Sequence, residues 1–72
     1  MDKNLHLIKL GSQIKNLRKA SGISQERLAL EAGIDRSYMG SIERGVRNVT
    51  FLTLVKIAEH LKCPVSELTK NI

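Results

Sequence analysis

Hydrophobic residues recur at intervals of three and four positions along the first twenty residues, and lysines and arginines stand between them. This spacing places the apolar side chains on one side of a helix and the charged side chains on the other. The pattern therefore predicts an amphipathic helix that ends near Ser21-Gly22. The apolar positions of this helix are Leu5, Ile8, Leu10, Ile14 and Leu17.

Two short helices joined by a glycine turn are predicted over residues 25–44. Ser24 precedes the first helix as a candidate N-cap, and Gly33 favours the left-handed conformation that ends a helix. Asp35 can cap the second helix, which is expected to end at Gly45. Two short helices that meet at a tight corner are typical of helix-turn-helix DNA readers, in which the second helix lies in the major groove with its N-terminal residues facing base edges.

A second run of apolar residues covers most of positions 51–61, and Thr50 is its candidate N-cap. Because the run is apolar around much of the helix, we expect it to be buried on two sides, against the core and against a second chain. Pro64 ends this pattern, since proline cannot donate the next helical hydrogen bond. Ser66 is then expected to cap a last short helix. Five helices with no strand pattern and no linker predict an all-α fold with a single domain over residues 1–72.

The 72-residue chain contains 12 lysines and arginines against 7 acidic residues, and its net charge of +5 favours polyanionic partners. A net positive charge can also serve only to keep a protein soluble, so the positions of the basic residues are more informative than their number. Arg36, Arg44 and Arg47 lie in or just after the second helix of the motif. Tyr38 and Phe51 are the only aromatic residues, so the core must consist of aliphatic side chains. A domain of this size buries only about 60% of the surface of its unfolded chain, which favours dimerisation.

Other chemistry has little support in the sequence. His60 and Cys63 are three positions apart, but the chain has only one other histidine and no other cysteine, so we expect no metal and no cofactor. The sequence contains no Ser/His/Asp set, glycine-rich phosphate loop or acidic cluster, and we therefore expect no enzyme activity. A lone cysteine cannot form an internal disulfide, and neither a signal-peptide core nor a membrane-length apolar stretch is present. The expected location is the cytoplasm, with no membrane association.

Four segments follow, in order and spacing, the pattern of the repressor and Cro type of helix-turn-helix proteins, which the chain resembles along nearly its whole length. These segments are Ile14-x-x-Leu17-Arg18, Gly22-Ile23-Ser24-Gln25-Glu26-x-Leu28-Ala29, Ala32-Gly33-Ile34 and Ile42-Glu43-Arg44-Gly45. Within this XRE-like family, the chain is most similar to the controller proteins of restriction-modification operons. That similarity rests on Asp35-Arg36-Ser37-Tyr38-Met39, on residues 42–49 and on the short length.

The resemblance implies a compact five-helix lambda-repressor-like domain and a homodimeric transcription factor. Controllers of this kind bind operator DNA upstream of their own gene and of the endonuclease gene, activating at low occupancy and repressing at high occupancy. The expected partners are double-stranded operator DNA, a second copy of the chain, a second dimer on an adjacent site, and RNA polymerase. A prophage-type repressor and an antitoxin-like module that neutralises a partner protein remain alternatives, and a general chromatin-like binder is a lesser one.

Eight residues are expected to contact DNA. Base contacts are expected from Arg36, Ser37, Tyr38 and Ser41, and phosphate contacts from Gln25, Arg44, Arg47 and Asn48. Arg36 is the best candidate, because its planar guanidinium can donate two hydrogen bonds to guanine O6 and N7. Packing of the Tyr38 ring within the protein is an equal alternative to a DNA contact, and a solvated charge is the alternative for Arg44.

The resemblance also implies an ion pair between Arg18 and Glu43 that ties two helices together. The expected dimer surface comes from the end of the fourth helix and from the fifth. It comprises Leu61, Val65, Leu68 and Ile72, with Phe51 and Leu52 as further candidates. The chain departs from the controllers at Ser37, where many of them carry threonine, and at Gly40, which costs a helix about 1 kcal/mol relative to alanine.

Overall fold

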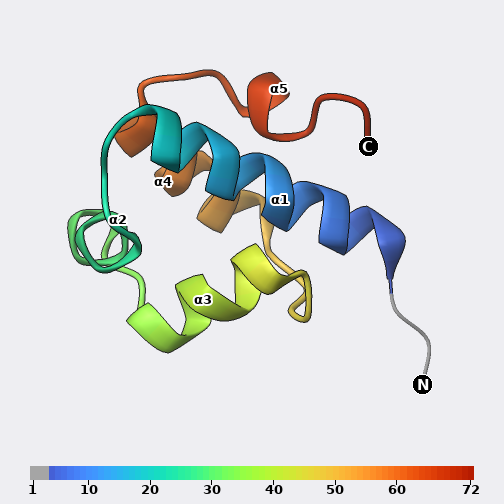
Figure 1. Ribbon diagram of the computed structural model, residues 1–72, viewed down its shortest axis with the longest axis horizontal. Helices are drawn as coiled ribbons and strands as arrows, with labels where there is room; N and C mark the ends of the chain where they lie inside the picture. Colours follow the sequence, from blue (N-terminus) through green and yellow to red (C-terminus); the bar gives the residue numbers. More distant parts are fainter. Residues whose placement is uncertain (1–3) are drawn as a thin grey trace.

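The computed structural model describes residues 4–72, so residues 1–3 of the expected domain lie outside it. This part of the chain forms five helices and no strand, which confirms the all-α prediction (Figure 1). In Figure 1, α1 crosses the centre in front of α4, with α3 below it and α5 above it. The helices are α1 (Leu5–Ala20), α2 (Gln25–Ala32), α3 (Arg36–Arg44), α4 (Phe51–Leu61) and α5 (Val65–Leu68).

Side-chain caps set the starts of four helices, three of them at the predicted residues. The side chains of Ser24, Asp35 and Thr50 each accept a hydrogen bond from the backbone N–H three residues later. Asn4, which had not been considered as a cap, accepts hydrogen bonds from the N–H groups of His6 and Leu7 and so starts α1. Local hydrogen bonding therefore accounts for these boundaries before any tertiary contact is considered.

The predicted cap of the last helix is wrong. Ser66 lies inside α5, which begins at Val65 directly after Pro64 and has no side-chain cap. The carbonyl of Pro64 already accepts a hydrogen bond from the N–H of Glu67 at 3.0 Å. Proline is well suited to this position, since its fixed backbone angle leads into the first turn of a helix.

One hydrophobic core joins all five helices. Its five completely buried large side chains come one from each helix, and they are Ile14, Leu28, Met39, Ile57 and Leu68. Burying a side chain of this kind contributes about 1.5 to 3 kcal/mol relative to leaving it in water. Leu5, at the start of the predicted apolar stripe, is instead 66% exposed. Over residues 4–72, none of the helices combines the length and the apolar character that a bilayer crossing needs.

The crossing of α1 over α3 depends on two glycines. A Cβ atom at Gly11 would collide with the backbone carbonyl of Ile42 and would lie 2.7 Å from that of Glu43. Gly45 has a left-handed backbone (φ 76°), and a Cβ there would lie 2.5 Å from the Cα atom of Ile8. These contacts bring the two helix backbones together. The sequence pattern predicted Gly45 as the end of α3 but gave no sign of the requirement at Gly11.

Two residues of the expected dimer surface belong instead to the core. Leu68 is completely buried and Leu61 is only 7% exposed. The reason is the path of the last segment: α5 folds back to contact both α1 and α4, and the side-chain amide of Gln13 donates a hydrogen bond to the carbonyl of Glu67 at 2.9 Å. The end of α4 at Leu61, which was assigned to a second chain, is therefore buried within the chain's own fold.

The remaining residues of that prediction stay accessible. Phe51, Leu52 and Ile72 are 66%, 71% and 42% exposed, and Val65 is half-buried against the core. Large apolar side chains exposed to this degree at the start of one helix are unfavourable in water unless a partner covers them. Phe51 and Leu52 thus remain candidates for a dimer contact, whereas Leu61 and Leu68 do not.

Candidate DNA-binding interface

Helices α2 and α3 form the predicted corner. Gly33 adopts a left-handed conformation (φ 68°), and the next N–H, that of Ile34, donates a hydrogen bond back to the carbonyl of Ala29 at 2.8 Å. This hydrogen-bonded closure of α2 leaves Asp35 in position to cap α3. Because Met39 and Ile42 point into the core, the opposite side of α3 is turned to solvent. Arg36, Ser37 and Arg44 are exposed on α3.

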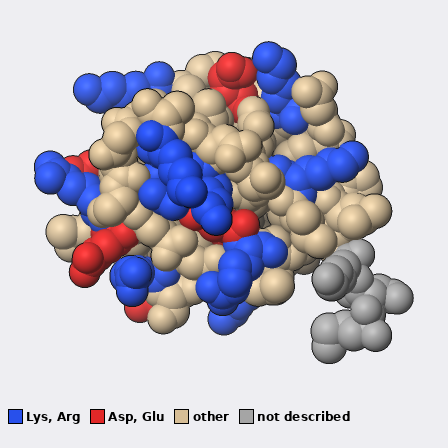
Figure 2. Space-filling view, viewed as in Figure 1, with Lys and Arg blue, Asp and Glu red and all other residues tan. Residues whose placement is uncertain are grey.

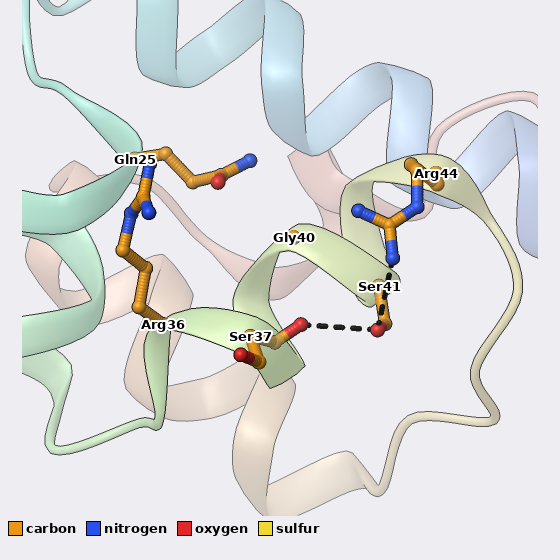
Figure 3. Close-up of a pocket in the computed structure, with 6 residues that line it drawn as sticks. All are labelled: Gln25, Arg36, Ser37, Gly40, Ser41 and Arg44. Atoms are coloured by element: carbon orange, nitrogen blue, oxygen red, sulfur yellow. Dashed lines mark hydrogen bonds between the residues drawn. The ribbon is translucent and has the colours of Figure 1, made fainter.

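The exposed side of α3 is hollowed. A depression of about 360 Å³ lies between the start of α2 and the length of α3, and Figure 3 shows its walls. The Arg36 side chain rises toward Gln25 at one end, and the Arg44 guanidinium lies beside Ser41 at the other. The lining residues are Gln25, Arg36, Ser37, Gly40, Ser41 and Arg44. The structure thus brings together five of the eight predicted DNA-contact residues and adds Gly40, which the sequence had marked only as a helix irregularity.

Two acidic groups lie near this hollow, and one of them is exposed while the other is buried. Asp35 accepts a hydrogen bond from the N–H of Tyr38 at 3.2 Å, and Glu43 is buried against Arg18. Arg36 and Arg44 are exposed, so their guanidinium groups face solvent around the hollow. Figure 2 shows lysine and arginine side chains spread over this face of the molecule, including its lower part, with smaller acidic areas among them. Such a surface attracts polyanions.

Arg18 and Glu43 form the predicted ion pair. The Arg18 guanidinium donates two hydrogen bonds to the Glu43 carboxylate, Nε to Oε2 at 2.7 Å and Nη2 to Oε1 at 3.1 Å. It donates a third hydrogen bond, from Nη1, to the carbonyl of Ile23 at 2.8 Å. Both charged side chains are nearly buried, at 9% and 2% exposure. The pair joins α1 to the end of α3 and to the loop before α2.

Gln25 belongs to the same network. Its side-chain amide donates a hydrogen bond to Glu43 Oε1 at 3.1 Å, which connects the first residue of α2 to the last turn of α3. One of the two N–H groups of this amide is therefore occupied in the protein alone, and its carbonyl oxygen lies at the hollow beside Gly40. A phosphate contact from Gln25 would come from the backbone N–H at the start of α2 or from the second N–H of the side-chain amide.

Ser41 has a positioning role in the free protein. Its hydroxyl donates a hydrogen bond to the carbonyl of Ser37 at 3.0 Å and accepts one from Arg44 Nη2 at 3.3 Å (Figure 3). Because the single hydroxyl proton is used within the helix, Ser41 would have to rotate in order to donate to a base. Its present contacts instead hold the Arg44 guanidinium over the hollow.

Tyr38 and Arg47 lie outside the hollow and contact each other. The Tyr38 ring is partly buried against the core, and the Arg47 guanidinium carbon stands 5.6 Å from the centre of that ring. A cation over an aromatic face at this distance is stabilised by the ring's electrons. The Tyr38 ring thus packs within the protein, which was one of its two expected roles. The contact with Arg47 holds the loop after α3 beside that helix. Asn48 is exposed in the same loop.

No metal-binding cluster of three or more His, Cys, Asp or Glu side chains is found within residues 4–72. His60 shares a hydrogen bond through Nδ1 with the carbonyl of Lys56 at 2.9 Å. Burial raises the pKa of the Cys63 thiol above its usual value, with a smaller contribution from the negative charge of Glu67. The surroundings of His60 and Cys63 are thus described by contacts within the protein.

The fold and this exposed helix match a known family. Residues 14–68 match the HTH_3 helix-turn-helix family, and the chain belongs to that family. Control protein C.MunI from Mycoplasma sp is 42% identical over 66 residues, which cover 90% of this chain and 89% of the relative.

Solved structures agree with this assignment. The restriction-modification controller protein C.AhdI from Aeromonas hydrophila superposes with a TM-score of 0.88 at 45% identity, covering 90% of this chain and 98% of that one. The biofilm regulator SinR of Bacillus subtilis, solved in complex with DNA, superposes with a TM-score of 0.79 at 38% identity over 82% of this chain and 95% of that one.

Proposed function

We propose that this DNA-binding helix-turn-helix protein is the controller of a restriction-modification operon, and that it binds operator DNA as a homodimer. The observation that carries the proposal is the hollow on α3, which the guanidinium groups of Arg36 and Arg44 flank. Its similarity to C.MunI and C.AhdI, over nearly the full length of all three chains, supports the controller assignment. Its place of action would be the cytoplasm.

In this proposal α3 enters the major groove. Arg36, at the N-terminal end of the helix, donates to O6 and N7 of a guanine, and Ser37 contacts the neighbouring base or phosphate. Arg44 and Arg47, with the backbone N–H groups at Gln25 and the side chain of Asn48, contact phosphates on either side of the groove. The phosphate contacts fix the register of the helix, and Arg36 supplies sequence discrimination.

Dimerisation places two copies of α3 on one side of the duplex. The exposed side chains of Phe51 and Leu52, with Val65 and Ile72 from the end of the chain, form the proposed contact. Two recognition helices about 34 Å apart would meet successive major grooves, so the operator should be an approximate inverted repeat. A second dimer on an adjacent site and a contact with RNA polymerase would account for repression at high occupancy and activation at low occupancy.

The experiment is nuclease protection on the DNA upstream of the chain's own gene. A protected inverted repeat at physiological salt supports the proposal, and protection that appears equally on scrambled DNA contradicts it.

The exposed apolar residues of the proposed dimer contact also suit an antitoxin-like module, whose main partner is another protein. That alternative predicts a stable one-to-one complex with a neighbouring gene product in the absence of DNA, and the genes beside this one discriminate between the two.

A further inference from the structure

Gly40 is buried within α3, yet its backbone conformation does not require a glycine. Its backbone is not among the positive-φ positions, which are Gly22, Gly33, Gly45 and two non-glycine residues over residues 4–72. Unlike Gly11, it is not pressed against the backbone of another helix. Glycine in the middle of a helix is less stable than alanine. The absence of a side chain at Gly40 therefore calls for an explanation on the outer surface of α3.

That outer surface is the floor of the hollow. A Cβ atom at Gly40 would lie 3.2 Å from Arg44 Nη1 and 3.4 Å from Gln25 Oε1, and both are terminal atoms of flexible side chains. In the free protein, a methyl group would thus be accommodated by a shift of a few tenths of an ångström in Arg44. The same methyl group would fill the lowest part of the space between the two arginines (Figure 3).

We propose that the space over Gly40 receives a hydrogen-bond acceptor of the operator, and that Gly40 sets how closely α3 approaches the DNA. The charged groups around the space are the guanidinium groups of Arg36 and Arg44, which can only donate, and the Gln25 amide oxygen lies beside them. Acceptors of matching chemistry on DNA are phosphate oxygens and the O6 and N7 atoms of guanine. The inference rests on the proposed DNA-binding function and adds to it a residue that permits a DNA contact by having no side chain.

The test is the variant Gly40→Ala, with Asn16→Ala on the exposed side of α1 as a control that adds no methyl group to the hollow. Thermal unfolding and sedimentation should show that Gly40→Ala melts at or above the wild-type temperature and has the same oligomeric state. Its affinity for the protected upstream duplex should fall on the order of tenfold, the effect of losing one good contact. Asn16→Ala should bind like the wild type. If Gly40→Ala keeps wild-type affinity, the inference is wrong.

A second pair of variants separates the space itself from the position of Arg44. In an Arg44→Ala background, the guanidinium that the new methyl group would displace is gone, so the fold has room for Gly40→Ala. The proposal predicts that Gly40→Ala still weakens binding in this background, because the methyl group meets the DNA. Loss of the effect in this background would show that Gly40 acts only through Arg44, which contradicts the proposal. This pair also answers the question if the single variant folds poorly.

The type of acceptor can be determined by comparing the affinities of Gly40→Ala and wild-type protein for single-base-pair variants of the binding site. Weakening concentrated at one base pair assigns a guanine edge, and uniform weakening across all duplexes assigns a phosphate; either result agrees with the inference. Failure of the proposed function looks different, since the wild-type protein would then fail to prefer the upstream duplex over a scrambled one. The wild-type measurement therefore comes first.

Discussion

The carboxylate of Glu43, one residue before Arg44, is held by two hydrogen bonds from the Arg18 guanidinium, at 2.7 and 3.1 Å. This contact positions the end of α3 from the side opposite its solvent-exposed hollow. Since Gln25 shares the same carboxylate, the pair also sets the relative position of α2 and α3. A change at Arg18 should therefore affect DNA binding without any contact between Arg18 and DNA.

Arg18→Ala should destabilise the fold by about 3 to 5 kcal/mol, because it leaves the Glu43 charge buried without its partner. Urea unfolding followed by circular dichroism measures the change. The matched control is Arg27→Ala, which removes an arginine from the exposed Arg27–Glu31 pair and should have little measurable effect on stability. Equal stability of the two variants would contradict a structural role for the buried pair.

Gly11→Ala should destabilise the crossing of α1 and α3 by about 1 to 3 kcal/mol or more, even though alanine is the better helix former. The added methyl group meets backbone carbonyls of Ile42 and Glu43, which cannot move aside without separating the helices. Thermal unfolding of this variant is compared with that of Ser12→Ala, at the neighbouring exposed position of the same helix. A melting temperature of Gly11→Ala at or above that of the wild type would show that α1 and α3 leave room for a methyl group at this crossing.

The revised dimer surface gives opposite predictions for exposed and buried leucines. Leu52→Glu should yield a folded monomer at micromolar concentration, since its side chain is 71% exposed and only the partner would be lost. Leu68→Glu should unfold the protein, because it places an unpaired charge in the core. Sedimentation and circular dichroism on both variants check this. A Leu52→Glu protein that remains dimeric would exclude this surface.

Cys63 should react slowly with iodoacetamide at neutral pH. Burial raises the pKa of its thiol, and the thiolate is the reacting species. The folded state therefore favours the protonated thiol, so this contribution to stability is present below the unfolded pKa and is lost as the pH rises through the higher folded value. Alkylation rates measured across pH should therefore rise at a higher pH for the folded protein in buffer than for the unfolded protein in denaturant. Equal pH profiles in the two conditions would contradict the effect of burial.

Local signals in the sequence were sufficient for the helix-turn-helix. Ser24, Asp35, Gly33 and Gly45 act through bonds and backbone angles within a few residues, so their roles can be recognised without the tertiary structure. The ion pair of Arg18 with Glu43 is 25 residues apart in sequence and was expected only from the family resemblance.

Features that depend on how distant segments meet were not predictable in the same way. Periodicity shows that α4 is apolar on a wide side, but it does not show that α5 covers Leu61 and that Leu68 is buried with it. Nor does it show that Gly11 meets the end of α3, or that Gly40 lies at the bottom of a hollow. Each of these depends on the packing of whole helices. The DNA-contact roles of the residues around the hollow remain predictions.

We expect the α3 surface around Arg36 to discriminate between DNA sequences. The most direct measurement is equilibrium binding of wild-type protein and Arg36→Ala to the upstream duplex and to its single-base-pair variants at moderate salt. Wild-type protein should prefer the upstream duplex over scrambled DNA by about a thousandfold or more. The Arg36→Ala variant should bind the upstream duplex with a free energy that is about 1 to 3 kcal/mol less favourable. It should also no longer distinguish bases at one position of each half-site. Arg36→Ala binding with wild-type affinity and wild-type base preference would contradict the account.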